Sequence, residues 1–237
     1  MIKKIINKAS EIILNILSFN TFKYVNKSYS QEGEDLFLSR YFKNKKEGYF
    51  IDVGAHHPQK FSNTYMLYKK GWNGVNIDAM PNSMKPFNKT RNRDQNIEIG
   101  VSKKAGMLKY FSFNAPAVNT FSEIEAKEKI EKKGYILKKT YEINTLPLAD
   151  ILNKHVPHNQ VIDFMTIDVE GLDMEVIETN DWNKFRPKLV LIEDLASKSI
   201  QELLDSDLNI KMISLGYRPV SKLFYSVIFE DTRHATV

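Results

Sequence analysis

Apolar runs of strand length alternate with apolar residues at helical spacing along most of the chain. The runs predict strands over residues 49–55, 74–79, 96–102, 161–169 and 188–194. The patterns between them predict helices over residues 31–43, 62–70, 83–90, 145–153, 171–179 and 199–213. A parallel sheet with crossover helices requires such alternation, so the chain belongs to the α/β class.

The last two predicted elements depart from this alternation. Strand-like runs over residues 217–224 and 225–231 follow each other directly. Because no helix separates them, they predict an antiparallel hairpin that closes one edge of the sheet. The expected architecture is a seven-stranded, doubly wound, Rossmann-like sheet, mostly parallel with an antiparallel C-terminal hairpin.

Residues 1–27 have a pattern of their own, with isoleucines at helical spacing and lysines mostly on the other side. They predict an amphipathic basic helix that precedes a single domain over residues 28–237. Asn7, Lys8 and Glu11 interrupt the apolar face too early for a membrane span, and no small-residue cleavage site follows. We favour packing of this helix on the domain or on a partner subunit, and peripheral contact with a membrane surface is the alternative.

Composition narrows the classes of function. The 237 residues are 42% hydrophobic, enough for one good core, and the absence of cysteine excludes disulfides, thiolate metal sites and cysteine nucleophiles. This composition fits a reducing cytosol, so we expect a cytoplasmic protein, with the inner membrane face as a peripheral location. The net charge is +5, but 28 of the 34 basic residues are lysine and no arginine cluster is interleaved with aromatic residues. Nucleic acid is therefore not the expected partner.

The first predicted strand runs into Asp52 and Gly54, at the sheet edge where nucleotide-like cofactors bind. The loop that follows lacks the G-x-G-x-x-G pattern that brings the backbone close to a pyrophosphate. A cofactor without phosphates, such as S-adenosylmethionine, fits a single glycine better. Asp78 lies 26 residues further on, at the end of the second strand, where a carboxylate can accept hydrogen bonds from ribose hydroxyls.

Several motifs occur in a fixed order along the chain. They are SQEGEDLFL (30–38), FIDVGAHHP (50–58), SNTYMLY (62–68), GWNGVNIDAMP (71–81), NTFS (119–122), IDFMTIDVEGLDMEVI (162–177) and PKLVLIED (187–194). In this order the chain, over about residues 28–231, resembles the FkbM-type S-adenosylmethionine-dependent methyltransferases. The resemblance implies a class I methyltransferase sheet. It also implies methyl transfer to a hydroxyl oxygen, often on a sugar of a surface glycan or on a secondary metabolite.

The resemblance also implies roles for individual residues at the cofactor site. Asp52 and Gly54 resemble the cofactor loop, Asp78 the ribose-binding acid, and Ser102 lies near the expected position of adenine. A turn at the end of each strand is the alternative interpretation of Asp52, Gly54 and Ser102.

Three further residues belong to family-typical segments. Gln31 and Glu34 lie in a helix that folds over the cofactor or simply packs on the sheet. Asn63 lies near the methionine moiety or supports the start of a helix.

Transfer to an alcohol requires a base within hydrogen-bond reach of the hydroxyl. Asp168 ends the fourth predicted strand and is the first candidate, although a bond to the cofactor amino group or to a helix start is equally compatible. Glu170 opens the next helix, where a negative charge is favoured in any case. His57 is the other candidate, because its ordinary pKa suits proton abstraction at neutral pH, and His56 ranks below it.

A metal-assisted reaction is a further hypothesis. Asp168 together with Glu193 and Asp194, after the fifth strand, would bring three carboxylates to one edge, which suits Mg²⁺. An electrostatic interpretation is the alternative: helix N-termini lie near these strand ends, and negatively charged side chains are favourable there. We favour a reaction without metal.

The long connection over residues 112–145 is the predicted cover on the acceptor side. Asn119, Thr120 and Phe121 would line its entrance, and the charged segment over residues 123–139 predicts a helix with a solvated face. The expected function is O-methylation of a sugar or metabolite hydroxyl. A nicotinamide-dependent oxidoreductase and a non-catalytic glycan-associated module remain as alternatives.

Overall fold

The computed structural model describes Lys8, Ser10 and residues 25–234. The amphipathic helix predicted over residues 1–27 lies almost entirely outside the described residues, so its separation from the domain stays a prediction. No helix in the described part of the chain combines the length and the apolar content needed to span a bilayer.

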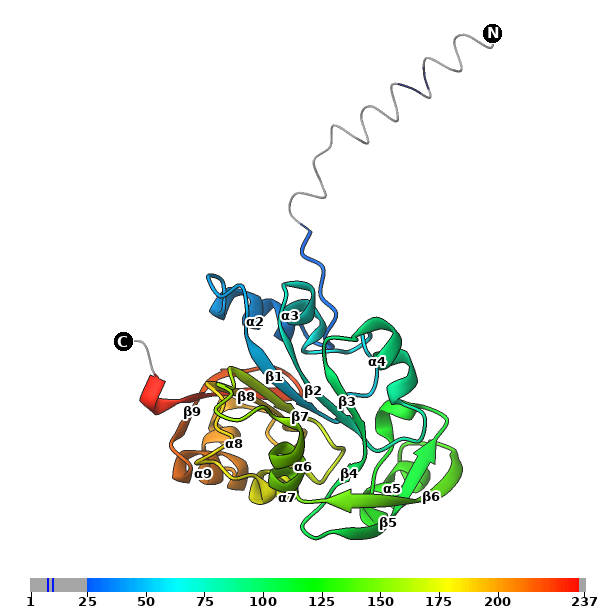
Figure 1. Cartoon of the computed structure of the whole chain (residues 1–237). Helices are drawn as coiled ribbons and strands as arrows, with labels where there is room; N and C mark the ends of the chain where they lie inside the picture. The colour runs from blue at the N-terminus through cyan, green and yellow to red at the C-terminus, as the bar shows by residue number, and fades with distance from the viewer. Residues whose placement is uncertain (1–7, 9, 11–24, 235–237) are drawn as a thin grey trace.

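A twisted sheet forms the centre of the molecule (Figure 1). Within the described residues it has seven strands in the order β3-β2-β1-β7-β8-β10-β9. The strands are β1 (Tyr49–Val53), β2 (Asn73–Asp78), β3 (Gln95–Glu98), β7 (Phe164–Ile167), β8 (Leu189–Glu193), β9 (Tyr217–Lys222) and β10 (Ser226–Asp231). Pairs from β3 to β8 are parallel, whereas β10 is antiparallel to both β8 and β9. The predicted α/β class, seven strands and C-terminal hairpin are confirmed.

Helices cover both faces of this sheet (Figure 1). On one face lie α2 (Glu34–Tyr41), α3 (Tyr65–Lys69) and α4 (Met84–Thr90), and on the other α6 (Leu148–His155), α7 (Asp173–Thr179), α8 (Ile200–Leu204) and α9 (Asp207–Ser214). All five residues of β1 are buried; Phe50 contributes to the core under α2 and α3, and Ile51 to the core under α6 and α7. The sheet is therefore doubly wound, as predicted.

A second, three-stranded sheet was not predicted. It contains β4 (Gly100–Val101), β5 (Gly106–Phe113) and β6 (Leu137–Leu146), in the order β4-β6-β5. The predicted strand over residues 96–102 is divided at Ile99, because the chain leaves the main sheet there to pair with β6. Within the predicted cover, α5 (Glu123–Glu131) is confirmed as a helix, but the end of the predicted helical segment belongs to β6. The helix expected from residue 145 begins only after Pro147.

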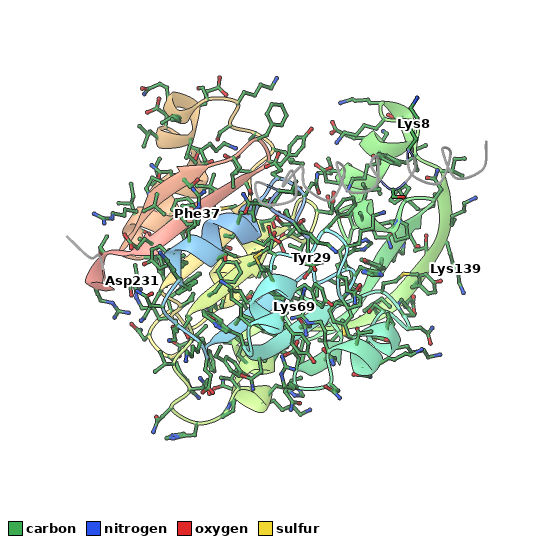
Figure 2. The ribbon with its side chains drawn as sticks, turned by 90° about the horizontal axis from the view of Figure 1, so that it is seen from above. Lys8, Tyr29, Phe37, Lys69, Lys139 and Asp231 are labelled. Carbon is green, nitrogen blue, oxygen red and sulfur yellow. The ribbon has the colours of Figure 1, made fainter. Side chains whose placement is uncertain are left out.

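The segment that leads into the domain is held on the outer helices. Tyr29 lies over α3, and its hydroxyl accepts a hydrogen bond of 3.0 Å from Lys69 Nζ (Figure 2). Its ring packs edge-on against Tyr65, with 4.7 Å between the centroids. Ser62 N donates to the Tyr29 carbonyl. These contacts place residues 30–34 at the carboxyl edge of the sheet.

A buried ion pair connects the first two strands with their helices. Arg91, fully buried after α4, donates from Nε to Asp94 (2.8 Å) and from a terminal nitrogen to Thr64 Oγ1 (2.9 Å). Asp94 also accepts from the Gly74 amide, at the start of β2. Thr64 in turn donates to Asp52 (2.6 Å), so the network reaches the end of β1.

Arg91→Met should lower the free energy of unfolding by about 3–5 kcal/mol, because it leaves the buried Asp94 carboxylate without its cation. Urea unfolding followed by circular dichroism measures the change. Arg40→Met, at the exposed end of α2, is the matched control and should change stability by about 0.5 kcal/mol or less. Equal loss in both variants would contradict the assigned role of the ion pair.

Candidate active site

A cleft lies at the carboxyl edge of the main sheet, where β1, β2, β7 and β8 end. It has two compartments that share Gly54, His56, Ala117, Asp168 and Glu170. The inner compartment, with an empty volume of about 550 Å³, is lined by β2, β4, β5 and the cover. The outer compartment, about 1290 Å³ including its open mouth, is lined by the segment before α2, the cover and the ends of β8 and β10.

Gly54 lies at the junction of the two compartments, where the turn after β1 approaches the end of β7. Its φ is +84°, and a β-carbon at this position would lie 1.7 Å from the carbonyl oxygen of Asp168. Its amide donates to the Ile77 carbonyl (2.9 Å), which connects the turn to β2. Only glycine tolerates both the left-handed backbone and this close approach.

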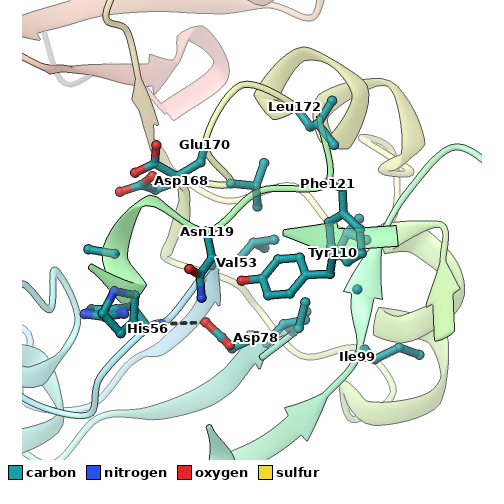
Figure 3. A pocket seen from close by; sticks show the side chains of 18 residues that line it. Val53, His56, Asp78, Ile99, Tyr110, Asn119, Phe121, Asp168, Glu170 and Leu172 are labelled. Carbon is teal, nitrogen blue, oxygen red and sulfur yellow. Dashed lines mark hydrogen bonds between the residues drawn. The ribbon is translucent and has the colours of Figure 1, made fainter. Parts of the chain in front are cut away.

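Asp78, at the end of β2, faces the inner compartment. One carboxylate oxygen accepts from the His56 amide (2.9 Å; Figure 3) and the other from the Met80 amide (2.8 Å). Burial raises the pKa of this carboxyl, and the two amide bonds oppose the shift. Each oxygen retains an acceptor site for a ligand hydroxyl.

Apolar side chains form the remaining wall of the inner compartment. Ile99 and Val101 come from the crossing between the two sheets, and Tyr110 packs against Phe121 with 4.7 Å between ring centroids. Figure 3 shows Asn119 and Tyr110 beside Asp78, with Asp168 and Glu170 further along the compartment. The result is a slot with one apolar wall that ends at a carboxylate, which suits a nucleoside.

Two residues predicted at the cofactor lie behind the wall instead. Asp52 is buried against Thr64 and lines neither compartment; burial raises its pKa to about 6. Ser102 donates to the Lys104 carbonyl and to Thr145, because the chain has already turned into the second sheet. Their predicted roles in cofactor binding stay predictions. The geometry favours a structural role for both residues, behind the wall of the inner compartment.

The other predicted cofactor residues line the outer compartment. Asn63 donates to Thr166 (3.1 Å), while its buried Oδ1 has no partner among the described residues. Glu34 is buried beneath Gln31 and accepts from the Glu32 amide and from Ser226. The structure therefore places Gln31, Glu34 and Asn63 in one cleft with Gly54 and Asp78.

Three carboxyl groups meet at the junction of the compartments. Asp168, Glu170 and Glu193 each have an oxygen within 4.8 Å of the others. Asp168 is open to the cleft but surrounded by protein, so burial and the neighbouring Asp173 and Glu170 raise its pKa well above the ordinary range. Burial and then Asp168 raise the pKa of Glu193 as well. Such a cluster is stabilised by a shared proton or by a cation.

Lys129 of α5 supplies one cation to this cluster. It is 2% exposed, and its Nζ donates to Glu170 Oε2 (2.8 Å) and to the Val118 carbonyl (2.9 Å). Thr120 Oγ1 donates to the Glu170 carbonyl (2.8 Å), and the backbone of Glu170 has a φ of +54°. The Lys129–Glu170 ion pair and the Thr120 hydrogen bond thus hold the cover against the loop after β7.

A comparison with protein families matches the methyltransferase FkbM domain over residues 52–219. This match includes every residue that lines the inner compartment and most of those that line the outer one. The chain belongs to the FkbM methyltransferase family. No curated protein matches the chain in a second comparison. Family membership makes this chain a methyltransferase and favours methyl transfer over the hydride transfer of a nicotinamide enzyme.

In this FkbM methyltransferase the two adjacent histidines differ in position. His57 Nδ1 accepts from the amides of Gln59 and Lys60, which turns its ring away from the cleft. His56, with a φ of +52°, lines both compartments, and burial lowers its pKa. The geometry therefore differs from the sequence ranking and favours His56 over His57 as the histidine nearer to the reaction.

The three acids that meet in this methyltransferase differ from the three that the metal hypothesis named. Glu193 joins Asp168 as expected, but Glu170 takes the third position. Asp194 is held by the amides of Ala196 and Ser197 and by Lys222. Lys129 already compensates one of the three charges. The preference for a reaction without metal stays a prediction.

Replacement of Lys129 by Met should loosen the cover, because Glu170 would lose its buried cation. We expect hydrogen exchange of the amides in α5 and residues 118–120 to become about tenfold faster or more. Lys127→Met, which removes an exposed lysine from the same helix, is the control and should leave exchange in residues 118–120 unchanged. Unchanged exchange in Lys129→Met would show that the ion pair does not hold the cover.

Proposed function

We propose that this protein is an S-adenosylmethionine-dependent O-methyltransferase that acts on a hydroxyl of a sugar or glycan. The observation that carries the proposal is the junction of two compartments at Asp168: a nucleoside-shaped slot on one side and an open polar cleft on the other. A donor and an acceptor bound in these compartments would meet at this carboxylate.

The inner compartment fits the cofactor in several independent respects. Asp78 would accept from the ribose hydroxyls, and Ile99, Val101 and Phe121 would enclose the adenine. Gly54 allows the turn after β1 to lie against the Asp168 carbonyl, which brings this turn and Asp168 together at the junction of the two compartments. The methionine moiety would pass Gly54 towards the outer compartment, where the unpartnered Oδ1 of Asn63 would accept from its ammonium group.

When bound, S-adenosylmethionine supplies an electrophilic methyl group on a sulfonium. Asp168 would hold the acceptor hydroxyl by a hydrogen bond and take its proton as the new carbon–oxygen bond forms. A carboxylate with a raised pKa is a better base near neutral pH than an ordinary aspartate.

The outer compartment supports a hydroxylated and uncharged acceptor. Glu34 and Gln31 offer acceptors and donors for hydroxyl groups, while Phe61 and Tyr225 offer ring faces. Among the described residues that line this compartment, four are carboxylic acids and none is lysine or arginine. A phosphate or carboxylate on the reacting sugar would be repelled.

Asp78→Ala should weaken binding of S-adenosylhomocysteine by about tenfold or more, because the ribose hydroxyls lose a buried acceptor. Isothermal calorimetry measures the affinity. Ser102→Ala is the matched control: this residue is buried near the slot but does not line it, so its affinity should be unchanged. Unchanged affinity of Asp78→Ala would remove Asp78 from the cofactor site.

Asp168→Asn should retain affinity for S-adenosylhomocysteine and lose about 10²-fold or more in turnover on a glycan that the wild type methylates. The base must be ionised, and its pKa is raised. Wild-type kcat/KM should therefore fall as the pH decreases through a value well above the ordinary carboxyl range. This acid limb should be absent in the variant. A parallel loss of cofactor affinity would instead assign Asp168 to cofactor binding.

A further inference from the structure

An apolar hollow adjoins the outer compartment on the side away from the cofactor slot. It lies between the loop after β8 and the β9–β10 turn, and its empty volume is about 1120 Å³. Leu195 and Tyr225 line both the hollow and the outer compartment, so the two spaces adjoin each other at these side chains. We call this surface the apolar ledge; its main side chains are Leu195, Ile200, Phe224 and Tyr225.

The ledge exposes an unusual amount of apolar surface. Phe224 is 76% exposed, Ile200 67%, Leu195 50% and Tyr225 41%. Single exposed apolar residues are ordinary on protein surfaces, but a contiguous group beside a cleft marks a binding surface. The same group lines one hollow, although it comes from two loops far apart in the sequence.

Hydrogen bonds hold the two loops against each other, so the exposed side chains form a defined surface of the folded domain. The Asp194 amide donates to the Tyr225 carbonyl (2.7 Å), and Lys222 Nζ donates to the carbonyls of Asp194 and Phe224. The Tyr225 amide donates to a carboxylate oxygen of Glu32 (2.8 Å), next to the segment that forms the cleft wall. Phe224 and Tyr225 pack edge to face, with 4.7 Å between their ring centroids.

We infer that the acceptor of this methyltransferase is amphiphilic: a hydroxylated, uncharged head in the outer compartment and an apolar aglycone on the ledge. The inference rests on the proposed function, and continuity of the ledge with the acceptor cleft identifies its occupant. A ligand whose hydroxyl reaches Asp168 would leave the cleft past Leu195 and Tyr225. Along this path the lining changes from carboxylic acids in the outer compartment to aliphatic and aromatic side chains on the ledge.

Binding of octyl glycosides compared with methyl glycosides of the same sugars tests this inference. Calorimetry on the full chain saturated with S-adenosylhomocysteine, below the micelle-forming concentration, should show at least one octyl glycoside that binds about tenfold more tightly than its methyl partner. Phe224→Ser should remove this preference and leave the affinity for the methyl glycoside unchanged. Ile213→Ser, which replaces an exposed isoleucine on α9 that does not line the ledge, should retain the preference.

Other outcomes overturn the inference. Equal affinity for octyl and methyl glycosides across the panel would show that the ledge takes no aglycone. An equal loss of the octyl preference in Phe224→Ser and Ile213→Ser would indicate that the octyl chain adsorbs nonspecifically to the protein surface. A concentration-dependent dimer that Phe224→Ser abolishes, without any octyl preference in the wild type, would assign the ledge to a second copy of the chain. Failure of S-adenosylhomocysteine to bind in the same calorimeter would reject the proposed function separately.

Discussion

The close approach of the turn after β1 to the end of β7 organises the whole cleft. The Asp168 amide donates to the Val53 carbonyl (3.0 Å), and the Asp168 carbonyl occupies the space where any side chain at position 54 would lie. This contact brings Asp168 to the opening between the two compartments. It also fixes Gly54 against Ile77, so that Asp78 faces the same opening from β2. Each side chain of the proposed site is positioned relative to this contact.

Charge is the second constraint on the site. Asp168, Glu170 and Glu193 lie close together. Glu170 contributes to the raised pKa of Asp168, both of these acids contribute to the raised pKa of Glu193, and Lys129 compensates the charge of Glu170. Because Lys129 belongs to the cover, the same ion pair that reduces the repulsion also holds the cover against the loop after β7. Cover and acids are therefore coupled, and movement of α5 would change the charge at the junction. A bound cationic cofactor would interact with the remaining two acids.

The main sheet was predictable from sequence because its central parallel strands are buried on both faces and are separated by helices of clear periodicity. Gly54, Asp78 and Asp168 follow such strands directly, so their shared location at one edge follows from the parallel topology. Gln31 and Glu34 were placed by family motifs rather than by periodicity.

What could not be predicted depends on local pairing. β6 begins in a lysine-rich segment whose charges resemble those of a solvated helix, and its partner β5 is defined only by the tertiary fold. Ser102 and Asp52 point behind the wall for reasons of register and hydrogen bonding that strand-end position does not reveal. Lys129 stands in a charged helix like several exposed lysines. The feature that distinguishes Lys129 from these lysines is its location three residues after Ala126, on the buried face of the helix.

The most direct test of this account is a crystal structure of the full chain with S-adenosylhomocysteine. The account predicts the adenosine between Phe121 and Ile99, the ribose hydroxyls on Asp78, and the sulfur at the junction beside Asp168, facing the outer compartment. S-adenosylhomocysteine bound in the outer compartment, or with its sulfur directed away from Asp168, would contradict it.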